Sequence, residues 1–100
     1  MRPVMHGDVV AAARALYAQP EGVRATTIER LITQARRADR FRREMGRAHP
    51  FWGDGSLMAA ALSTDPPPEP ALANEEYCAC LAQVFEALIS RERSSRKLAS

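Results

Sequence analysis

The sequence predicts a small all-α protein of about four helices, with a proline-rich linker before the C-terminal helix. Apolar residues recur at helical spacing in several segments, and no segment has the pattern of a strand or of an internal repeat. Ala and Leu are abundant while β-branched residues are few, which also favours helices. One hundred residues make a single domain with a thin core, so we expect support from a homo-oligomer or a larger partner.

The first helix is expected at about residues 8–18, after an irregular lead over residues 1–7. Its apolar positions follow helical spacing and are Val9, Val10, Ala13, Leu16 and Tyr17. Asp8 is expected to cap it, because a carboxylate accepts hydrogen bonds from the free N–H groups of a first turn. Pro20 either breaks the chain or begins the next helix.

A long second helix is expected from about Pro20 or Val23 to about Met45, with Gly46 as its stop. A helical wheel gives it a buried side made of Ile28, Leu31, Ala35, Ala38, Phe41 and Met45. The opposite side carries Arg36, Arg40, Arg43 and Arg47. Arg42 lies near the apolar edge, where we expect its stem to be buried and its charged end to extend outward.

A short third helix is expected to follow Ser56, which is a good N-cap, and to include Leu57, Met58, Ala61 and Leu62. These segments complete a helical core over residues 1–62. Residues 63–73 form the linker, because Pro66, Pro67, Pro68 and Pro70 exclude helix and favour an extended chain.

The C-terminal amphipathic helix is expected over about residues 74–93, with Asn74 as its cap. Its apolar stripe consists of Tyr77, Leu81, Val84, Phe85, Leu88 and Ile89. Residues 94–100 are expected to be a flexible basic tail.

The charges of the chain are segregated, although the formal net charge is only +2. Residues 36–47 hold six arginines, residues 64–76 hold only acidic charges, and residues 91–97 are basic again. Such segregation provides a basic surface for anions, and arginine suits phosphate. We expect weak, non-specific contact with the backbone of double-stranded DNA. The candidate nucleic-acid-binding residues are Arg36, Arg37, Arg40, Arg43, Arg47, Arg93, Arg96 and Lys97.

No pattern of catalytic or metal-binding residues is recognisable. His6 and His49 are the only histidines, and a catalytic site would use one of them with Asp8 or Asp54 as its orienting carboxylate. No nucleophile elbow, metal-ligand spacing or glycine-rich phosphate loop accompanies them. We therefore expect no enzyme activity, no cofactor and no metal.

Cys78 and Cys80 are expected to be structural residues. Side chains two positions apart on a helix point in different directions, so these two do not form half of a zinc site. The sequence shows no signal peptide and no stretch long enough to span a bilayer, so we expect a cytoplasmic protein with reduced cysteines and no membrane partner.

The loop RAHPFWGDGS, residues 47–56, has two interpretations. In the structural one, His49–Pro50 ends the second helix, Gly53 and Gly55 form a turn, and Phe51 and Trp52 cover the core. In the functional one, an exposed Trp52 anchors a partner protein. The candidate partner-binding residues are Phe51, Trp52, Tyr77, Leu81, Phe85 and Leu88.

Three segments carry a resemblance to a known family: MRPVMHGDVVAAARAL, RAHPFWGDGSLMAAAL and EYCACLAQVFEALI. They resemble short proteins of Rhodobacter-type bacteria that are encoded at the head of gene-transfer-agent clusters, just before the packaging ATPase. Those proteins are regarded as small terminase subunits of phage-derived particles. The similarity covers about residues 1–90 and is one of overall pattern, since none of the segments is a catalytic signature.

The resemblance implies a non-enzymatic DNA-packaging adaptor that contacts DNA and binds or regulates the large terminase ATPase and nuclease. The chain departs from phage small terminases, which commonly begin with a helix-turn-helix. The arginines of the second helix come too late in it for a recognition helix. Two alternatives stay open, namely a small DNA-binding transcriptional regulator and a purely structural interaction domain that binds no nucleic acid.

Overall fold

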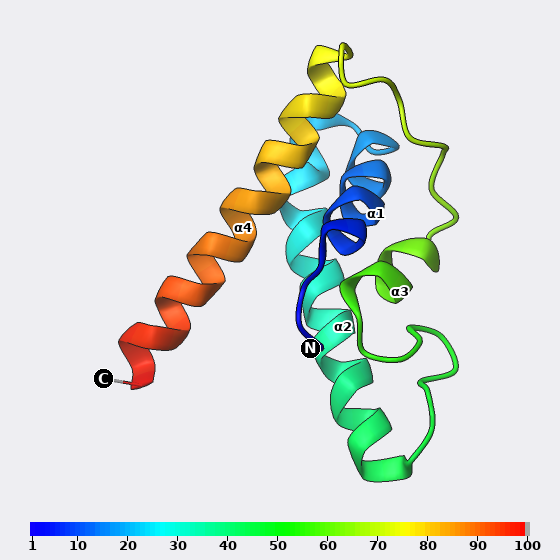
Figure 1. Ribbon diagram of the computed structural model, residues 1–100, viewed down its shortest axis with the longest axis vertical. Helices are drawn as coiled ribbons and strands as arrows, with labels where there is room; N and C mark the ends of the chain where they lie inside the picture. Colours follow the sequence, from blue (N-terminus) through cyan, green and yellow to red (C-terminus); the bar gives the residue numbers. More distant parts are fainter. Residues whose placement is uncertain (100) are drawn as a thin grey trace.

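The computed structural model describes residues 1–99, with side chains for residues 1–97, and it confirms the all-α prediction (Figure 1). The helices are α1 (His6–Tyr17), the 3-10 turn η1 (Glu21–Val23), α2 (Arg24–Met45), α3 (Leu57–Leu62) and α4 (Glu75–Ala99). No strand occurs within residues 1–99, where the only β-type pairing is an isolated bridge between His49 and Gly53.

Helix α1 is the centre of the fold, since it contacts α2, α3 and α4. Its alanines Ala11, Ala12, Ala13 and Ala15 are all buried. A helix with apolar residues on every side is stable only when it is enclosed, and small side chains let its neighbours come close. The larger core side chains come from all four helices and include Leu16, Leu31, Ile32, Leu57 and Tyr77.

Helix α1 begins at His6, two residues before the predicted start, and Met5 rather than Asp8 is its N-cap. Asp8 is a buried residue of the first turn. One of its carboxylate oxygens accepts a hydrogen bond from the Met5 N–H and the other from the Met58 N–H, both at 2.8 Å. Asp8 therefore joins the first turns of α1 and α3, which a sequence pattern does not reveal.

Helix α2 begins at Arg24, just after Val23, and ends at Met45 as predicted. Gly46 has the left-handed backbone (φ 73°) that was expected of the stop. The predicted buried side is correct up to Ala38, but Phe41 is half-buried and Met45 is 58% exposed. The last turn of α2 extends beyond the other helices (Figure 1), which agrees with the exposure of Met45.

Helix α3 and helix α4 have the predicted caps. The Ser56 hydroxyl accepts a hydrogen bond from the Ala59 N–H at 3.0 Å, and the Asn74 side chain accepts one from the Tyr77 N–H at 2.9 Å. The linker between them contains no helix, as expected, and it is fastened to the core. Arg14 donates to the Pro67 carbonyl at 2.8 Å, and the Tyr77 hydroxyl donates to Glu69 at 2.6 Å.

Helix α4 runs to Ala99, so the segment expected to be a flexible tail is helical through that residue, and Ser100 lies outside the described residues. The first half of α4 buries Tyr77, Cys80 and Val84 against the core. Its second half leans away from α2 and projects from the bundle (Figure 1). Within residues 1–99, no helix combines the length and the apolar character that crossing a membrane requires.

Candidate nucleic-acid interface

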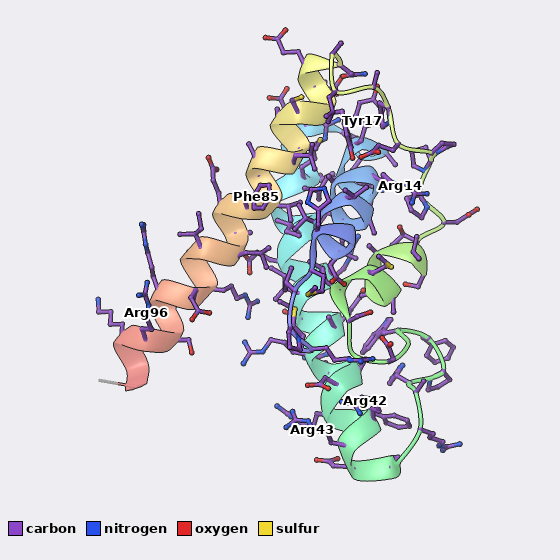
Figure 2. The ribbon with its side chains drawn as sticks, viewed as in Figure 1. Arg14, Tyr17, Arg42, Arg43, Phe85 and Arg96 are labelled. Carbon is purple, nitrogen blue, oxygen red and sulfur yellow. The ribbon has the colours of Figure 1, made fainter. Side chains whose placement is uncertain are left out.

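The exposed face of α2 presents arginines that the fold leaves available. Arg36, Arg40 and Arg43 are spaced four and three residues apart, so they lie along one face of the helix, with Arg37 on its flank. All four are exposed, and Arg43 projects outward in Figure 2. Among residues 1–97, the guanidinium groups of Arg36, Arg37 and Arg40 have no hydrogen-bond or ion-pair partner. Neighbouring cations with no acidic partner favour the binding of an anion.

Asp39 is the acidic residue that pairs with the positive charges on the buried side of the arginine face. Its buried carboxylate lies 2.9 Å from the Arg42 guanidinium, 3.5 Å from that of Arg43 and 3.6 Å from the Met1 amino group. The hydrogen bond from Arg42 lowers the pKa of Asp39, and the charge of Arg43 acts in the same direction. Asp39 therefore stays ionised and neutralises part of the positive charge of Arg43.

The outward extension predicted for Arg42 is wrong. Besides its contact with Asp39, Arg42 donates through Nε to the Asp54 carbonyl oxygen at 3.0 Å. The loop after α2 folds back along the helix and supplies this acceptor. Arg42 is thus a structural residue that binds the loop to α2. The arginines available to an anion are Arg36, Arg37 and Arg40.

A groove lies between α2 and the projecting half of α4. Two adjoining hollows of about 500 and 380 Å³ form it, and Arg36 and Arg91 line both. Arg91, which the sequence did not single out, is held by Glu29 at 3.1 Å. Ser94 and Ser95 add hydroxyl groups, so one edge of the arginine face continues onto α4.

The basic residues near the end of α4 do not join this groove. Arg93, Arg96 and Lys97 are exposed. Arg93 and Lys97 border a shallow surface made only of α4 residues, together with Glu86 and Ile89. The predicted set of eight basic residues therefore forms at least two separate surfaces, because the two helices diverge.

The loop after α2 closes on itself through hydrogen bonds, and it does not itself end the helix. Gly46 ends the helix, so the role predicted for His49–Pro50 is wrong. Two backbone hydrogen bonds, of 2.8 and 3.1 Å, join His49 to Gly53. Gly53 (φ 82°) and Gly55 (φ 96°) have the left-handed conformation that was expected of this turn.

Aromatic rings gather around His49 in this loop. The Trp52 indole stacks on the imidazole, with centroids 4.5 Å apart and planes 5° apart, and Phe41 meets it edge-on at 5.0 Å. The Nδ1 atom of His49 accepts hydrogen bonds from the Phe51 and Trp52 N–H groups at 3.1 and 3.2 Å. The Arg47 guanidinium lies 5.7 Å from the centre of the Phe41 ring.

The expectation that Phe51 and Trp52 cover the core is therefore wrong. Phe51 is 75% exposed and Trp52 is half-buried, and neither belongs to the core cluster. The loop contacts α2 and α3 from outside, where a Cβ on Gly53 would lie 2.6 Å from the Ala59 side chain.

The predicted partner-binding stripe of α4 is mostly occupied. Tyr77 is fully buried, which rules it out as a docking residue while α4 stays in place, and Leu81 and Leu88 are partly buried against the core. Phe85 remains 47% exposed, and Ile89, which was absent from the predicted set, is 48% exposed. A single amphipathic stripe cannot distinguish a core contact from a partner contact, since both need apolar residues at the same spacing.

The two carboxylates considered for catalysis, Asp8 and Asp54, bind other groups. Asp8 binds two backbone N–H groups, while Asp54 accepts a hydrogen bond from the Ser56 N–H at 3.1 Å and lies 2.8 Å from Arg2. The hydrogen bonding from Ser56 lowers the pKa of Asp54. Neither carboxylate is bonded to a histidine, and residues 1–97 hold no group of three or more potential metal ligands.

The two cysteines face different environments, as their spacing predicted. Cys78 is exposed and its thiol donates to the Leu72 carbonyl at 2.8 Å, while Cys80 is buried. Burial raises the pKa of the Cys80 thiol. Neither sulfur is disulfide-bonded.

Comparison with known proteins places the chain in a family by sequence alone. No curated protein and no solved structure matches the chain. One family model matches residues 2–88, from the N-terminal segment to the middle of α4. The match covers the arginine face, the aromatic loop and the docked half of α4, so the chain belongs to the DUF7742 family, a domain of unknown function.

Proposed function

We propose that this protein is a non-enzymatic DNA-packaging adaptor of the small-terminase type. In this proposal it acts in the cytoplasm, contacts the backbone of double-stranded DNA through α2, and binds the large terminase through the projecting half of α4. The observation that carries the DNA contact is the row of exposed arginines without partners, Arg36, Arg37 and Arg40. The packaging role rests on the resemblance of three segments to gene-transfer-agent proteins.

The position of α2 favours backbone contact over sequence reading. A recognition helix presents its first turns to the bases of the major groove. Here Arg24, the only basic residue of the first turn of α2, is buried and bonded to α1 and α4, so it is not available to read bases. The available arginines lie farther along the helix, and phosphate contacts from arginine position a protein without reading sequence.

The projecting half of α4 supports the second contact. Phe85, near the end of the docked half, and Ile89, at the start of the projecting half, form an exposed apolar edge, and Ile89 lies beside Arg93 and Lys97. Large apolar side chains at the centre of an interface supply much of its binding energy. The large terminase is the partner expected from the resemblance.

The DNA contact is tested by combining Arg36→Glu with Arg40→Glu and measuring affinity for a random duplex at several salt concentrations. Affinity should fall, and the slope of its logarithm against log salt should decrease by about two, one for each lost phosphate contact. The matched control combines Arg93→Glu with Lys97→Glu, which changes the net charge equally on another surface. An equal loss in the control would show that net charge, not the α2 face, governs binding.

Two further results would favour the alternatives. Binding to one defined duplex about 1,000-fold tighter than to random DNA would indicate a transcriptional regulator. If the wild-type protein bound no DNA at all, the result would favour the other alternative, a structural interaction domain that binds no nucleic acid.

The partner contact is tested by capture of the large terminase. Phe85→Ser combined with Ile89→Ser should weaken capture, whereas Leu72→Ser, which removes an exposed apolar residue of the linker, should not. Unchanged capture by the double variant would contradict docking on α4.

A further inference from the structure

Trp52 presents an aromatic surface that the loop holds in place without a ligand. One side of the indole stacks on His49 at 4.5 Å, and the backbone N–H of Trp52 donates to Nδ1 of the same imidazole at 3.2 Å. The backbone pair between His49 and Gly53 closes the loop around it. A ring that is already fixed loses little conformational entropy when a ligand binds.

The indole borders two open hollows on the surface of α2, and arginines line both. The first, of about 350 Å³, is shared with Arg37 and Arg40 and with one acid, Glu44. The second, of about 430 Å³, is shared with Arg30 and again with Arg37, and its one acid is Glu29, which is paired with Arg91. Arg30, Arg37 and Arg40 have no hydrogen-bond or ion-pair partner among residues 1–97, so their guanidinium groups are available beside the ring.

A flat aromatic ring beside guanidinium groups matches the chemistry of a nucleotide. Bases stack on aromatic side chains, and arginine binds phosphate oxygens through its paired N–H groups. A base in a duplex is already stacked between its neighbours, whereas an unpaired base can turn outward onto a protein ring. The arrangement therefore favours an unpaired nucleotide over a paired one.

We infer that Trp52, Arg37 and Arg40 bind a nucleotide of single-stranded DNA, with its base on the indole and its phosphate against the two arginines. The inference rests on the proposed function and deepens it. The protein holds duplex backbone through Arg36, Arg37 and Arg40, and it also engages unpaired strands, such as a frayed DNA end, where Trp52 of the aromatic loop adds a stacking surface.

The test uses the full chain, whose single tryptophan is itself the reporter. Oligothymidylate of about eight nucleotides should quench the Trp52 fluorescence, because a stacked base contacts the indole directly. In an anisotropy assay with the labelled oligonucleotide, Trp52→Leu should weaken binding roughly 5- to 150-fold. Phe51→Leu is the matched control, since Phe51 is an exposed aromatic residue of the same loop that lines neither hollow.

A second variant covers the case in which Trp52→Leu disturbs the loop. Arg37→Gln lies on the exposed face of α2, and it should weaken oligothymidylate binding while leaving the fluorescence of the unliganded protein unchanged. Circular dichroism of each variant checks its helix content.

The outcomes separate this inference from the proposed function. Unquenched fluorescence, or unchanged oligothymidylate binding by both Trp52→Leu and Arg37→Gln, would overturn the nucleotide site even with duplex binding intact. A Trp52 signal that responds only to the large terminase would also overturn it and assign the loop to protein docking. Failure of the wild-type protein to bind either form of DNA would overturn both proposals.

Discussion

Arg24, the first residue of α2, forms an ion pair with Glu76 in the first turn of α4, with the Arg24 Nη2 atom 2.6 Å from a Glu76 carboxylate oxygen. The same guanidinium donates through Nε to the carbonyls of Leu16 and Gln19, at 2.9 and 3.0 Å. The last carbonyls of a helix have no partner within the helix. One buried arginine at the start of α2 therefore completes the end of α1 and holds the first turn of α4.

Replacing Arg24 should destabilise the protein far more than replacing Glu76. Arg24→Leu removes every one of these bonds, so we expect a loss of about 2–3 kcal/mol in the free energy of unfolding, although the Leu16 carbonyl keeps a hydrogen bond from the Gln19 N–H at 2.9 Å. Glu76→Gln should lose less than about 1 kcal/mol, because its side chain is 58% exposed and the carbonyl bonds remain. Urea unfolding measures both. Equal losses would show that the ion pair, not the bonds to the end of α1, dominates.

Three glycines should respond to alanine in a graded order. A Cβ on Gly55 would lie 2.6 Å from the Asp39 Cα atom, and its φ of 96° is itself unfavourable for alanine, so Gly55→Ala should lose more than about 2 kcal/mol. Gly46 shares the positive φ but has open space, so Gly46→Ala should lose about 1 kcal/mol. Gly22→Ala meets neither obstacle and should be nearly neutral or stabilising. Thermal unfolding ranks them, and a neutral Gly55→Ala would contradict the close approach of loop and helix.

Acid should destabilise the fold through Asp39 and Asp54. Arg42 lowers the pKa of Asp39, and Ser56 lowers that of Asp54, so each carboxyl holds its proton less tightly in the folded state than in the unfolded state. Their contribution is complete above the ordinary aspartate pKa of about 3.9 and is lost as the pH falls through the lower folded values. Urea unfolding across this range should show a smaller dependence on pH in Asp39→Asn than in the wild type.

Asp65→Asn is the matched control for this measurement, because the Asp65 side chain is exposed and accepts no hydrogen bond from residues 1–97. It should keep the wild-type dependence on pH. If Asp39→Asn also kept it, the carboxylate would contribute nothing to acid sensitivity.

The sequence predicted the parts of the fold that depend on neighbouring residues. Ser56 and Asn74 cap the helices they precede, and Gly46 ends α2, because each acts within a single turn. The contacts of Asp8 with Met58 and of Arg42 with Asp54 could not be predicted, since these partners are backbone groups 50 and 12 residues away. Backbone N–H and C=O groups are the same in nearly every residue, so the sequence does not show which of them a distant side chain will bind.

The sequence predicted only those features of the candidate site that depend on residues close together in the chain. Helical spacing alone placed Arg36, Arg40 and Arg43 on one exposed face. Whether that face continues onto α4 depends on the direction in which α4 leaves the bundle, which its amphipathic pattern does not encode. The stacking of Trp52 on His49 needed the closed loop, although the pair lies only three residues apart.

Tyr77→Phe should loosen the linker without unfolding the core. The Tyr77 ring stays buried, but the hydroxyl that donates to Glu69 at 2.6 Å is lost, so the stability should fall by only about 1 kcal/mol. Cleavage of the linker by elastase should become faster, since one of its fastenings to the core is gone. Tyr17→Phe is the matched control, because its hydroxyl binds Asn74 rather than the linker. Equal cleavage rates in the two variants would contradict this role of Glu69.

The two cysteines should differ sharply in their reaction with iodoacetamide. The thiolate is the reacting form, and Cys80 is both buried and raised in pKa by that burial, so it should stay unmodified in the folded protein. Cys78 is exposed and should react, and denaturant should then release the second thiol. Mass spectrometry of the folded wild type should find one modification, and the Cys78→Ser variant should show none. Rapid modification of Cys80 in the folded Cys78→Ser variant would contradict its burial between the first half of α4 and the core.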